Sequence, residues 1–366
     1  MSALLEENRE VEIPPALVIT SGDPAGVGPE VVHKAIKRIQ RKSEILSQRP
    51  ILVVGDAFLF ARHLDKPAAM QAYNIILCDD FLEEPGFLIH HMLPEPGEPW
   101  RPIFLDCGEK SSSEIKPGES TVASARRGLV YLAAAVELLQ GGLADAVCTG
   151  PLRKSMAEKA GFPYPGQTEM FGDMFKVKLP VMLLVGGGLR VSLATIHQPL
   201  QEVPRLLTKR LVRNALDLTL QSLREEFGIR EPRVAVCGMN PHAGEEGKFG
   251  NEERRIIRPV VLEARRDGWN VAGPLSADSV FAMARKGRYD GVVAMYHDQG
   301  LIPVKTLAFE EGVNVTLGLP IVRTSPDHGT AIDIAGKFQA DEGAMAAAIQ
   351  LADTLSTRRR KQAVRQ

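Results

Sequence analysis

Residues 16–30 have the sequence ALVITSGDPAGVGPE, in which a short apolar run enters a glycine-rich turn and then the start of a helix. Ala16 to Thr20 has the length and the β-branched content of a buried strand, and the helix is expected from about Pro29. The turn from Gly22 to Gly28 lacks the spacing of a Rossmann turn, and no ribose-binding acid follows at the proper place on a second strand. The stretch therefore predicts a strand–turn–helix unit whose turn is not a dinucleotide site.

Apolar runs of strand length alternate with helical stretches along the rest of the chain. Further strands are expected at 51–54, 144–148, 190–196, 233–237 and 291–295, and helices at 120–139, 203–227 and 251–267. This alternation predicts an α/β fold with a largely parallel sheet. Because ligands bind beyond the carboxyl ends of parallel strands, polar residues just after the predicted strands should gather along one edge. Such residues are Thr20 to Asp23, Thr149, His197, His242 and His297.

The bulk composition excludes several classes of protein. The chain has 366 residues, which suits two domains, and its formal net charge of −1 favours neither a nucleic-acid nor a membrane-surface partner. No apolar stretch is long enough to span a bilayer, and residues 1–15 lack the layout of a signal peptide. The four cysteines show no metal-binding spacing. We therefore expect a cytoplasmic protein with reduced thiols.

Three histidines each follow a predicted strand in a loop marked by glycine or proline: His197, His242 and His297. Neutral imidazole is the commonest metal ligand, and three of them with an open position suit a catalytic divalent ion that polarises a hydroxyl or carbonyl oxygen. Their spacing matches no local metal motif, so each could instead be a hydrogen-bonding residue of its own loop.

Two acids and three donors extend this candidate site. Asp298 follows His297, and Asp278 lies before an apolar helical run, so either could support or bind the ion, although Asp278 could instead be a helix N-cap. Converging donors late in the chain would bind phosphate or carboxylate, and otherwise they are solvated surface groups. These donors are Lys305, Asn314 and Arg323.

The segment DHGTAIDIAGK at 327–337 is a glycine-containing loop expected to enter a helix. Backbone amides of such a loop can approach an adenosine closely, because glycine has no side chain to keep a ligand away. The segment is therefore the candidate nucleotide site.

Taken together, these segments resemble the 4-hydroxythreonine-4-phosphate dehydrogenase family of pyridoxal phosphate biosynthesis. The similarity extends from about Leu17 to Gln350, and its motifs are long. They are TSGDPAGVGPE at 20–30, TGPL at 149–152, GMNPHAGE at 238–245, YHDQG at 296–300 and NVTLGLP at 314–320.

The resemblance implies a fold like that of isocitrate and isopropylmalate dehydrogenases, with two domains and an active-site cleft between them. Residues 1–150 and 305–366 would form the nucleotide-side domain, and 151–304 the domain with the metal, substrate and dimer contacts. The implied site residues are the metal ligands His197, His242 and His297, the substrate contacts Thr168, Lys305, Asn314 and Arg323, the acids Asp278 and Asp298 near the reacting centre, and the cofactor contacts His328, Gly329 and Asp333.

The implied activity is oxidation of the 3-hydroxyl of 4-phosphooxy-L-threonine by NAD or NADP, helped by zinc, magnesium, manganese or cobalt. The β-keto acid product would lose carbon dioxide to give 3-amino-2-oxopropyl phosphate. The family also implies a homodimer in which both subunits contribute to each metal site. Two alternatives are a dehydrogenase of another phosphorylated hydroxy acid, 4-phospho-threonate or 4-phospho-erythronate, and a metabolite-binding protein without turnover. The sequence chooses neither the metal nor between NAD and NADP.

One position departs from the family. The turn GQTE at 166–169 has Gln167 where the family usually has a histidine that contacts substrate. Glutamine donates and accepts hydrogen bonds but cannot carry charge. We expect Gln167 to bind substrate, and its identity bears on which phosphorylated acid the protein prefers.

Overall fold

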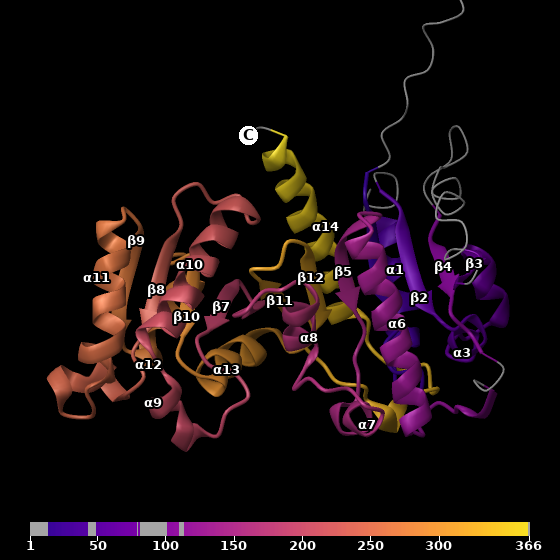
Figure 1. The fold of residues 1–366 in the computed structure, drawn as a ribbon, viewed down its shortest axis with the longest axis horizontal. Helices are drawn as coiled ribbons and strands as arrows, with labels where there is room; N and C mark the ends of the chain where they lie inside the picture. Colours follow the sequence, from indigo (N-terminus) through magenta and orange to yellow (C-terminus); the bar gives the residue numbers. More distant parts are fainter. Residues whose placement is uncertain (1–13, 43–48, 79, 81–100, 110–112, 365–366) are drawn as a thin grey trace, which may run out of the picture.

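The computed structural model describes residues 14–42, 49–78, 80, 101–109 and 113–364. In these residues the strands form one twelve-stranded sheet that crosses the whole molecule (Figure 1), in the order β3-β4-β2-β1-β5-β12-β11-β6-β7-β10-β8-β9. No helix within the described ranges is both long and apolar enough to span a membrane. The strands are β1 Ala16–Thr20, β2 Ile51–Gly55, β3 Asn74–Leu77, β4 Ile103–Asp106, β5 Ala144–Thr149, β6 Val181–Gly186, β7 Leu189–Leu193, β8 Arg233–Cys237, β9 Asn270–Leu275, β10 Gly291–Ala294, β11 Val313–Leu317 and β12 Val322–Pro326.

The α/β class is confirmed, and most expected strands are present, although the strand expected at 190–196 ends at Leu193. The helix expected at 203–227 is interrupted after Leu206, and the one at 251–267 begins with a π-helical turn at Glu253–Ile257. The helices are α1 Gly28–Lys42, α3 Ala57–Ala61, α6 Val122–Gln140, α7 Lys154–Lys159, α8 Gln167–Met174, α9 Val203–Leu206, α10 Lys209–Glu225, α11 Arg258–Arg266, α12 Ala277–Arg285, α13 His297–Ala308 and α14 Gly343–Ala363.

The strand directions correct the expectation of one polar edge. β1, β2, β4, β5 and β12 run parallel, but β11 is antiparallel to both β12 and β6, and β6 is antiparallel to β7. β7, β10, β8 and β9 are parallel to one another. The sheet therefore has two parallel blocks that point in opposite directions, joined by the antiparallel strands β11 and β6, and the carboxyl ends of the strands in the two blocks lie at opposite edges. The expected two-domain division stays a prediction.

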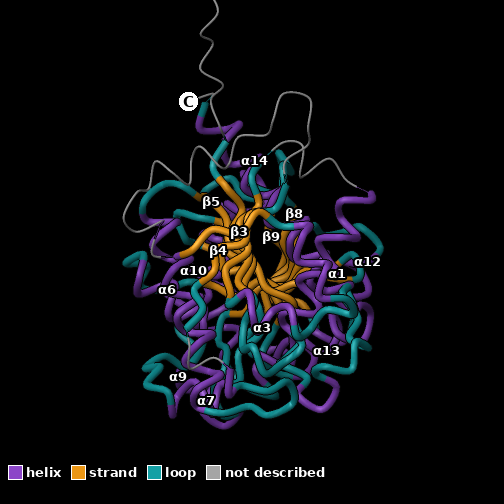
Figure 2. The backbone as a smooth tube through the Cα atoms, turned by 90° about the vertical axis from the view of Figure 1, so that its right-hand side faces the viewer, coloured by secondary structure: helices purple, strands orange, loops and turns teal. Residues whose placement is uncertain are grey.

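Helices cover both faces of the sheet, as the end-on view of the strand layer shows (Figure 2). On one face, α1, α10, α11 and α14 pack on a single apolar core that extends through both blocks. On the other face, α6 packs on one cluster, and α12 and α13 pack on another. The second face is therefore covered in two parts, with the middle of the sheet between them.

The glycine turn after β1 is a packing junction. A Cβ atom on Gly28 would lie 2.1 Å from the Ser21 carbonyl oxygen, and one on Gly26 would lie 2.7 Å from that of Thr330. The Val27 amide donates to Thr330 O at 2.9 Å, so the turn holds the loop that contains the candidate nucleotide segment. These contacts give the turn a packing role, and the expectation that a nucleotide binds elsewhere stays a prediction.

His33 on α1 makes the free energy of unfolding dependent on pH. Its side chain is buried, with Nδ1 2.9 Å from the Tyr73 hydroxyl, and burial, assisted by the charge of Lys37, lowers its pKa from 6.5 to about 4. Between those values the unfolded chain binds a proton that the folded chain excludes, so stability is complete above pH 6.5 and falls as the pH falls towards 4. From pH 7.5 to 5 we expect a loss of about 2 kcal/mol from this residue.

Urea unfolding of the wild type and of His33→Gln at both pH values measures this loss. The variant should be less stable at pH 7.5, and its stability should decline less on acidification. A residual slope is expected because burial also lowers the pKa of His63. Equal pH dependence in the two proteins would show that His33 is not excluded from protonation.

Candidate active site

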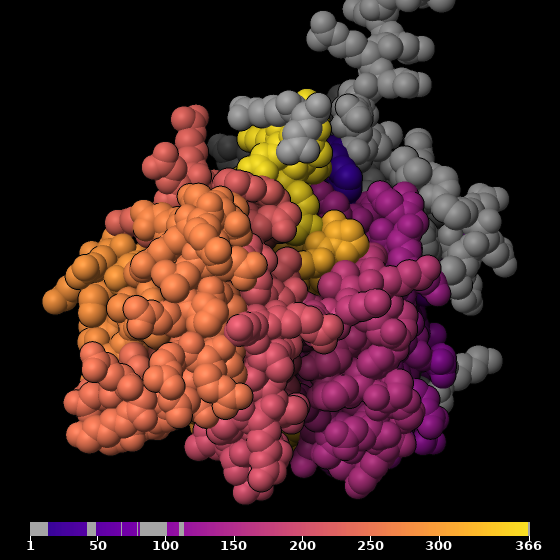
Figure 3. Space-filling view, turned by 60° about the vertical axis from the view of Figure 1, so that its left-hand side comes forward, coloured from indigo at the N-terminus to yellow at the C-terminus, as the bar shows by residue number. Residues whose placement is uncertain are grey.

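A pocket of about 290 Å³ lies over the middle of the sheet, between the two helical covers. Phe162 and Tyr164 on one side pack against the cluster under α6, whereas Met182 and Leu301 on the other belong to the cluster under α12 and α13. A furrow between the magenta and pink surface regions is visible in the space-filling view (Figure 3). The pocket is thus formed where the two parallel blocks meet, not at a sheet edge.

Arg323 on β12 is the buried cation of this pocket. Its guanidinium donates to Thr149 Oγ1 at 2.7 Å, to Gln167 Oε1 at 2.8 Å and to Thr316 Oγ1 at 3.2 Å. All three acceptors are neutral, and burial lowers the Arg323 pKa to about 10, which leaves it protonated at neutral pH. The expected anion contact is therefore a preformed cationic group in a cavity.

Strand alternation places the other expected polar groups beside it. On β11, Asn314 and Thr316 face the pocket side. The alternate residues Val313, Val315 and Leu317 belong to the core on the other face. Asn314 lines the pocket, and its Oδ1 is buried without a hydrogen-bond partner. Such an unpartnered acceptor in a cavity indicates a donor on a ligand.

Gln167 and Thr168 begin α8 and also line the pocket. Gln167 accepts from Arg323 and donates through Nε2 to the Gly150 carbonyl at 3.2 Å, so both ends of its amide are in use. Thr168 Oγ1 lies 3.4 Å from Thr316 Oγ1. Within this chain, Gln167 thus positions the Arg323 side chain rather than pointing unengaged into the cavity.

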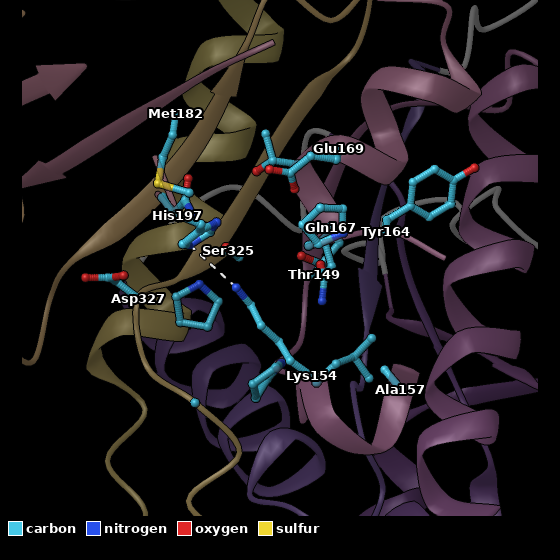
Figure 4. A pocket seen from close by; sticks show the side chains of 18 of the residues that line it. Thr149, Lys154, Ala157, Tyr164, Gln167, Glu169, Met182, His197, Ser325 and Asp327 are labelled. Carbon is cyan, nitrogen blue, oxygen red and sulfur yellow. Dashed lines mark hydrogen bonds between the residues drawn. The ribbon is translucent and has the colours of Figure 1, made fainter. Parts of the chain in front are cut away.

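His197, after β7, and His297, at the start of α13, come together in the pocket, with ring centroids 5.7 Å apart. Asp298 Oδ1 lies 2.7 Å from His297 Nδ1, so Nε2 is the nitrogen left for a ligand. Burial, and then the charge of Lys154, lower the His197 pKa, which favours the neutral imidazole that binds metals. Lys154 Nζ lies 3.5 Å from His197 Nε2 (Figure 4).

His242 is not part of this pair. It lies exposed in the turn Pro241–Gly247 after β8, and its nearest aromatic contact is Phe249, with centroids 6.4 Å apart. Among the described residues, no group of three or more histidine, cysteine, aspartate or glutamate side chains is arranged to hold a metal ion. The donor chemistry at His197 and His297 fits a metal centre, but this single chain brings together two of the three expected ligands.

The remaining expected residues are placed less centrally. Lys305 forms an ion pair with Asp327, Nζ to Oδ2 3.1 Å, and lines a neighbouring depression with His297 rather than the main pocket. Asp278 is exposed in the first turn of α12, where Ser276 and not Asp278 is the N-cap residue. The N-cap alternative for Asp278 is therefore wrong, and its role near the reacting centre stays a prediction.

The candidate nucleotide loop reaches the pocket at one end. His328 and Gly329 line it, the Nε2 atom of His328 is buried without a partner, and nothing lies within 4 Å of a Cβ placed on Gly329. Asp333 is exposed in a single 3₁₀ turn, Ile332–Ile334, and the next helix begins only at Gly343, so the loop does not enter a helix directly as expected. The open backbone at Gly329 suits a ligand, and the nucleotide contacts stay a prediction.

Sequence reasoning missed two charged residues of the pocket, Lys154 and Glu169. Glu169 is the last residue of the GQTE turn, and Lys154 follows the TGPL turn by two residues, but no spacing marks either as different from a surface charge. Thr316 could have been predicted to lie on the same face as Asn314, because residues 313–317 alternate apolar and polar side chains as a half-buried strand does.

Comparisons with known proteins show the family of this chain. The sequence profile of the family described as pyridoxal phosphate biosynthetic protein PdxA matches residues 48–352. A 4-hydroxythreonine-4-phosphate dehydrogenase of Geobacter metallireducens is 43% identical over 92% of this chain and 94% of that protein. The crystal structure of an enzyme of that name from Klebsiella pneumoniae is similar with a TM-score of 0.74 at 34% identity, covering 93% of this chain and 98% of that one. A relative in Bradyrhizobium diazoefficiens, provisionally named D-threonate 4-phosphate dehydrogenase, is 38% identical over 93% of this chain and 96% of its own.

Proposed function

The chain belongs to the family of the pyridoxal phosphate biosynthetic protein PdxA, and from this premise we propose that it oxidises 4-phosphooxy-L-threonine with NAD or NADP in the cytoplasm. The observation that carries the proposal is the buried charge of Arg323 in the same pocket as the His197–His297 pair. One group binds an anionic substrate, and the other lies where a hydroxyl can be activated.

The residues of the pocket divide the work of binding. Arg323 holds the phosphate, Asn314 Oδ1 accepts a hydrogen bond from the substrate, and Gln167 and Thr149 fix the guanidinium in place. The guanidinium is held by neutral acceptors and forms no ion pair with a carboxylate among the described residues, although the charge of Glu169 acts on it and partly opposes the lowering of its pKa by burial. Its donors thus remain available to an anionic ligand. Arg323 therefore orients the substrate with its hydroxyl towards the histidine pair.

His197 and His297 are the ligands we assign to a divalent ion, zinc, magnesium, manganese or cobalt, with His242 as the third ligand. When bound, the ion would supply Lewis-acid activation of the substrate hydroxyl, and NAD or NADP would supply the hydride acceptor. Asp298 fixes the tautomer and orientation of His297 through its Nδ1 contact. Asp298 and Asp278 are the proposed acids near the reacting centre, and His328, Gly329 and Asp333 the proposed nucleotide contacts.

The exposed position of His242 supports a homodimeric arrangement. Because His197 and His297 lie together in one chain and His242 does not join them, a third ligand from the partner subunit would complete the set. The active site is then shared between two copies of this chain.

A substrate panel tests the proposal directly. Metal-reconstituted protein is supplied with NAD and, separately, NADP, and reduced nicotinamide is followed by absorbance with 4-phosphooxy-L-threonine, 4-phospho-threonate and 4-phospho-erythronate. We expect the highest kcat/KM with 4-phosphooxy-L-threonine. A clear preference for 4-phospho-threonate would favour the second candidate function, to which the Bradyrhizobium relative points.

Gln167→His tests the position that departs from the family. A neutral imidazole can still accept from Arg323, so kcat/KM at pH 8 should change by less than about tenfold. Protonation below about pH 6.5 would place two cations in contact, so the variant should lose activity there, with a step that the wild type lacks. The pH profiles of kcat/KM for the wild type and for Gln167→His test this expectation. Higher activity of the variant at low pH would show that a positive charge at this position helps the substrate instead.

A further inference from the structure

The loop that carries His242 has an unusual backbone conformation. Five successive residues, 242–246, have φ values of 52°, 52°, 82°, 39° and 57°, and Gly244 is the one glycine among them. Residues with a Cβ atom rarely adopt this left-handed conformation, and they seldom do so in succession, because the Cβ atom comes too close to the following carbonyl oxygen. Such a run persists only where the surrounding structure fixes it, and strained backbone of this kind is concentrated at functional sites.

The carboxylate of Glu253 holds the start of this loop. Glu253 begins the π-helical turn Glu253–Ile257, and it is only 5% exposed. Its Oε1 atom accepts hydrogen bonds from the backbone amides of Met239 and Asn240, at 2.8 and 2.7 Å, and its Oε2 atom accepts one from Asn240 Nδ2 at 3.0 Å. Hydrogen bonds to an ionised acceptor are among the stronger ones in proteins, so this single side chain fixes the path of the backbone after β8.

The same carboxylate also lies against the left-handed residues. A Cβ atom on Gly244 would lie 2.6 Å from Glu253 Oε2, so glycine there allows the loop to close around the carboxylate. Gln299, two residues after His297, gives a second buried support. Its Nε2 atom donates to the Gly238 carbonyl at 2.7 Å, and its Oε1 atom accepts from the Met295 amide at 2.7 Å. Buried side chains therefore hold the loop from the inside.

The position of the His242 imidazole depends on this support. His242 is exposed, so the packing of its own ring does not fix where the ring lies. A metal ligand has to be held within about 0.5 Å of its productive position, which for an exposed side chain requires a fixed backbone. Whatever fixes the backbone of residues 242–246 therefore decides whether His242 can complete a metal site.

We propose that Glu253 is a positioning residue for the metal centre, because its carboxylate holds the left-handed loop that presents His242 to the ion. The inference deepens the proposed function and rests on it for the role of His242 as a ligand. Glu253 is not among the residues that line the pocket, and it acts through His242 rather than by touching the substrate.

Zinc binding to the full-length protein tests the inference without relying on turnover. Isothermal titration calorimetry with zinc chloride, after removal of metal by chelation, compares the wild type with Glu253→Gln. The substitution removes the negative charge and turns an acceptor that faces Asn240 Nδ2 into a donor. The zinc Kd should rise about 10- to 100-fold, the usual effect of losing a group that orients a metal ligand. Excess zinc should restore turnover, which a misfolded variant would not regain.

A double variant shows whether the effect passes through His242. If it does, His242→Ala/Glu253→Gln should bind zinc as weakly as His242→Ala and no more weakly, because the ligand that Glu253 positions is already absent. Equal zinc affinity in the wild type and Glu253→Gln would overturn the inference, and so would a further loss in the double variant. If Glu253→Gln does not fold, Asn240→Ala removes a contact of the same carboxylate at a half-buried position, and unchanged zinc affinity there would overturn it.

A control variant and turnover separate this inference from the proposed function. Glu263→Gln makes the same substitution at an exposed residue of α11 and should leave zinc affinity unchanged. A wild type that binds zinc but forms no reduced nicotinamide would contradict the proposed function and leave the role of Glu253 standing. Zinc affinity in His242→Ala equal to that of the wild type would instead refute the ligand assignment on which the inference rests.

Discussion

Replacing His297 by alanine is expected to lower kcat/KM roughly a thousandfold, equivalent to about 4 kcal/mol of transition-state stabilisation. The His297 ring lies beside His197, and Asp298 occupies its Nδ1, so the substitution removes the nitrogen we assign to the metal ion. Chelation of the wild type should cause a similar loss, and zinc, magnesium, manganese or cobalt should restore activity to the wild type only.

Asp298→Asn should weaken metal binding about 10- to 100-fold, and excess metal ion should restore its activity. Full activity of the chelated, metal-free wild type would contradict the metal centre.

The same variant tests whether the site is shared. A subunit that lacks His197 and a subunit that lacks His297 should not restore activity to each other. Both rings come from the same chain, so each site of the mixed dimer still lacks one of the two histidines. Lesions in His242 and His297 should complement if the partner subunit supplies His242. In a mixed dimer of these two variants, one of the two active sites then has all three histidines. Mixing the variants and letting the dimers reassemble should therefore restore part of the activity. A fully active monomer would exclude this arrangement.

The reversal of strand direction was the main feature of the fold that the sequence analysis missed. Continuous apolar runs such as 233–237 predicted their strands well, because burial on both faces needs no alternation. The reversal arises at the hairpin between β6 and β7, where Gly187 and Gly188 have φ values of 58° and 80°. Two strand-like runs, 181–185 and 189–193, separated only by the three glycines 186–188 are a hairpin signal, so this reversal could be predicted from the sequence. The position of β11 between β12 and β6 depends on pairing between segments distant in the sequence, so it could not be predicted from the sequence.

The candidate site was predicted unevenly for a similar reason. Residue type and position after strands pointed to His197 and His297, which the fold does bring together. Whether a charged side chain is buried or paired depends on segments distant in the sequence. Lys305, for example, forms an ion pair with Asp327, which lies in the loop after β12. Glu169 looked like an ordinary helix-start acid, and its unpartnered oxygen is apparent only in the cavity.

Arg323→Met is expected to lower kcat/KM about a hundred- to a thousandfold on the phosphorylated substrate, because it removes charged hydrogen bonds of roughly 1.5–3 kcal/mol each. The side chain is buried and its acceptors Thr149, Gln167 and Thr316 are neutral, so no other protein charge replaces it. Arg323→Lys should recover only part of the loss, since an ammonium group cannot reproduce the fork of donors. Steady-state kinetics, with urea unfolding to confirm the fold, measures both effects.

The substrate without its phosphate identifies what Arg323 binds. If the guanidinium holds the phosphate, the wild type should lose most of its kcat/KM on the dephosphorylated compound, and Arg323→Met should add little further penalty because the interaction is already absent. Lys305→Met is the matched comparison, and its effect should be smaller because Lys305 is already neutralised by Asp327 at the margin of the pocket. If Arg323→Met lowers kcat/KM equally on the phosphorylated and dephosphorylated substrates, the guanidinium binds the substrate carboxylate instead. The phosphate would then need a different cation, and Lys154 is the other lysine or arginine that lines the pocket in the described residues.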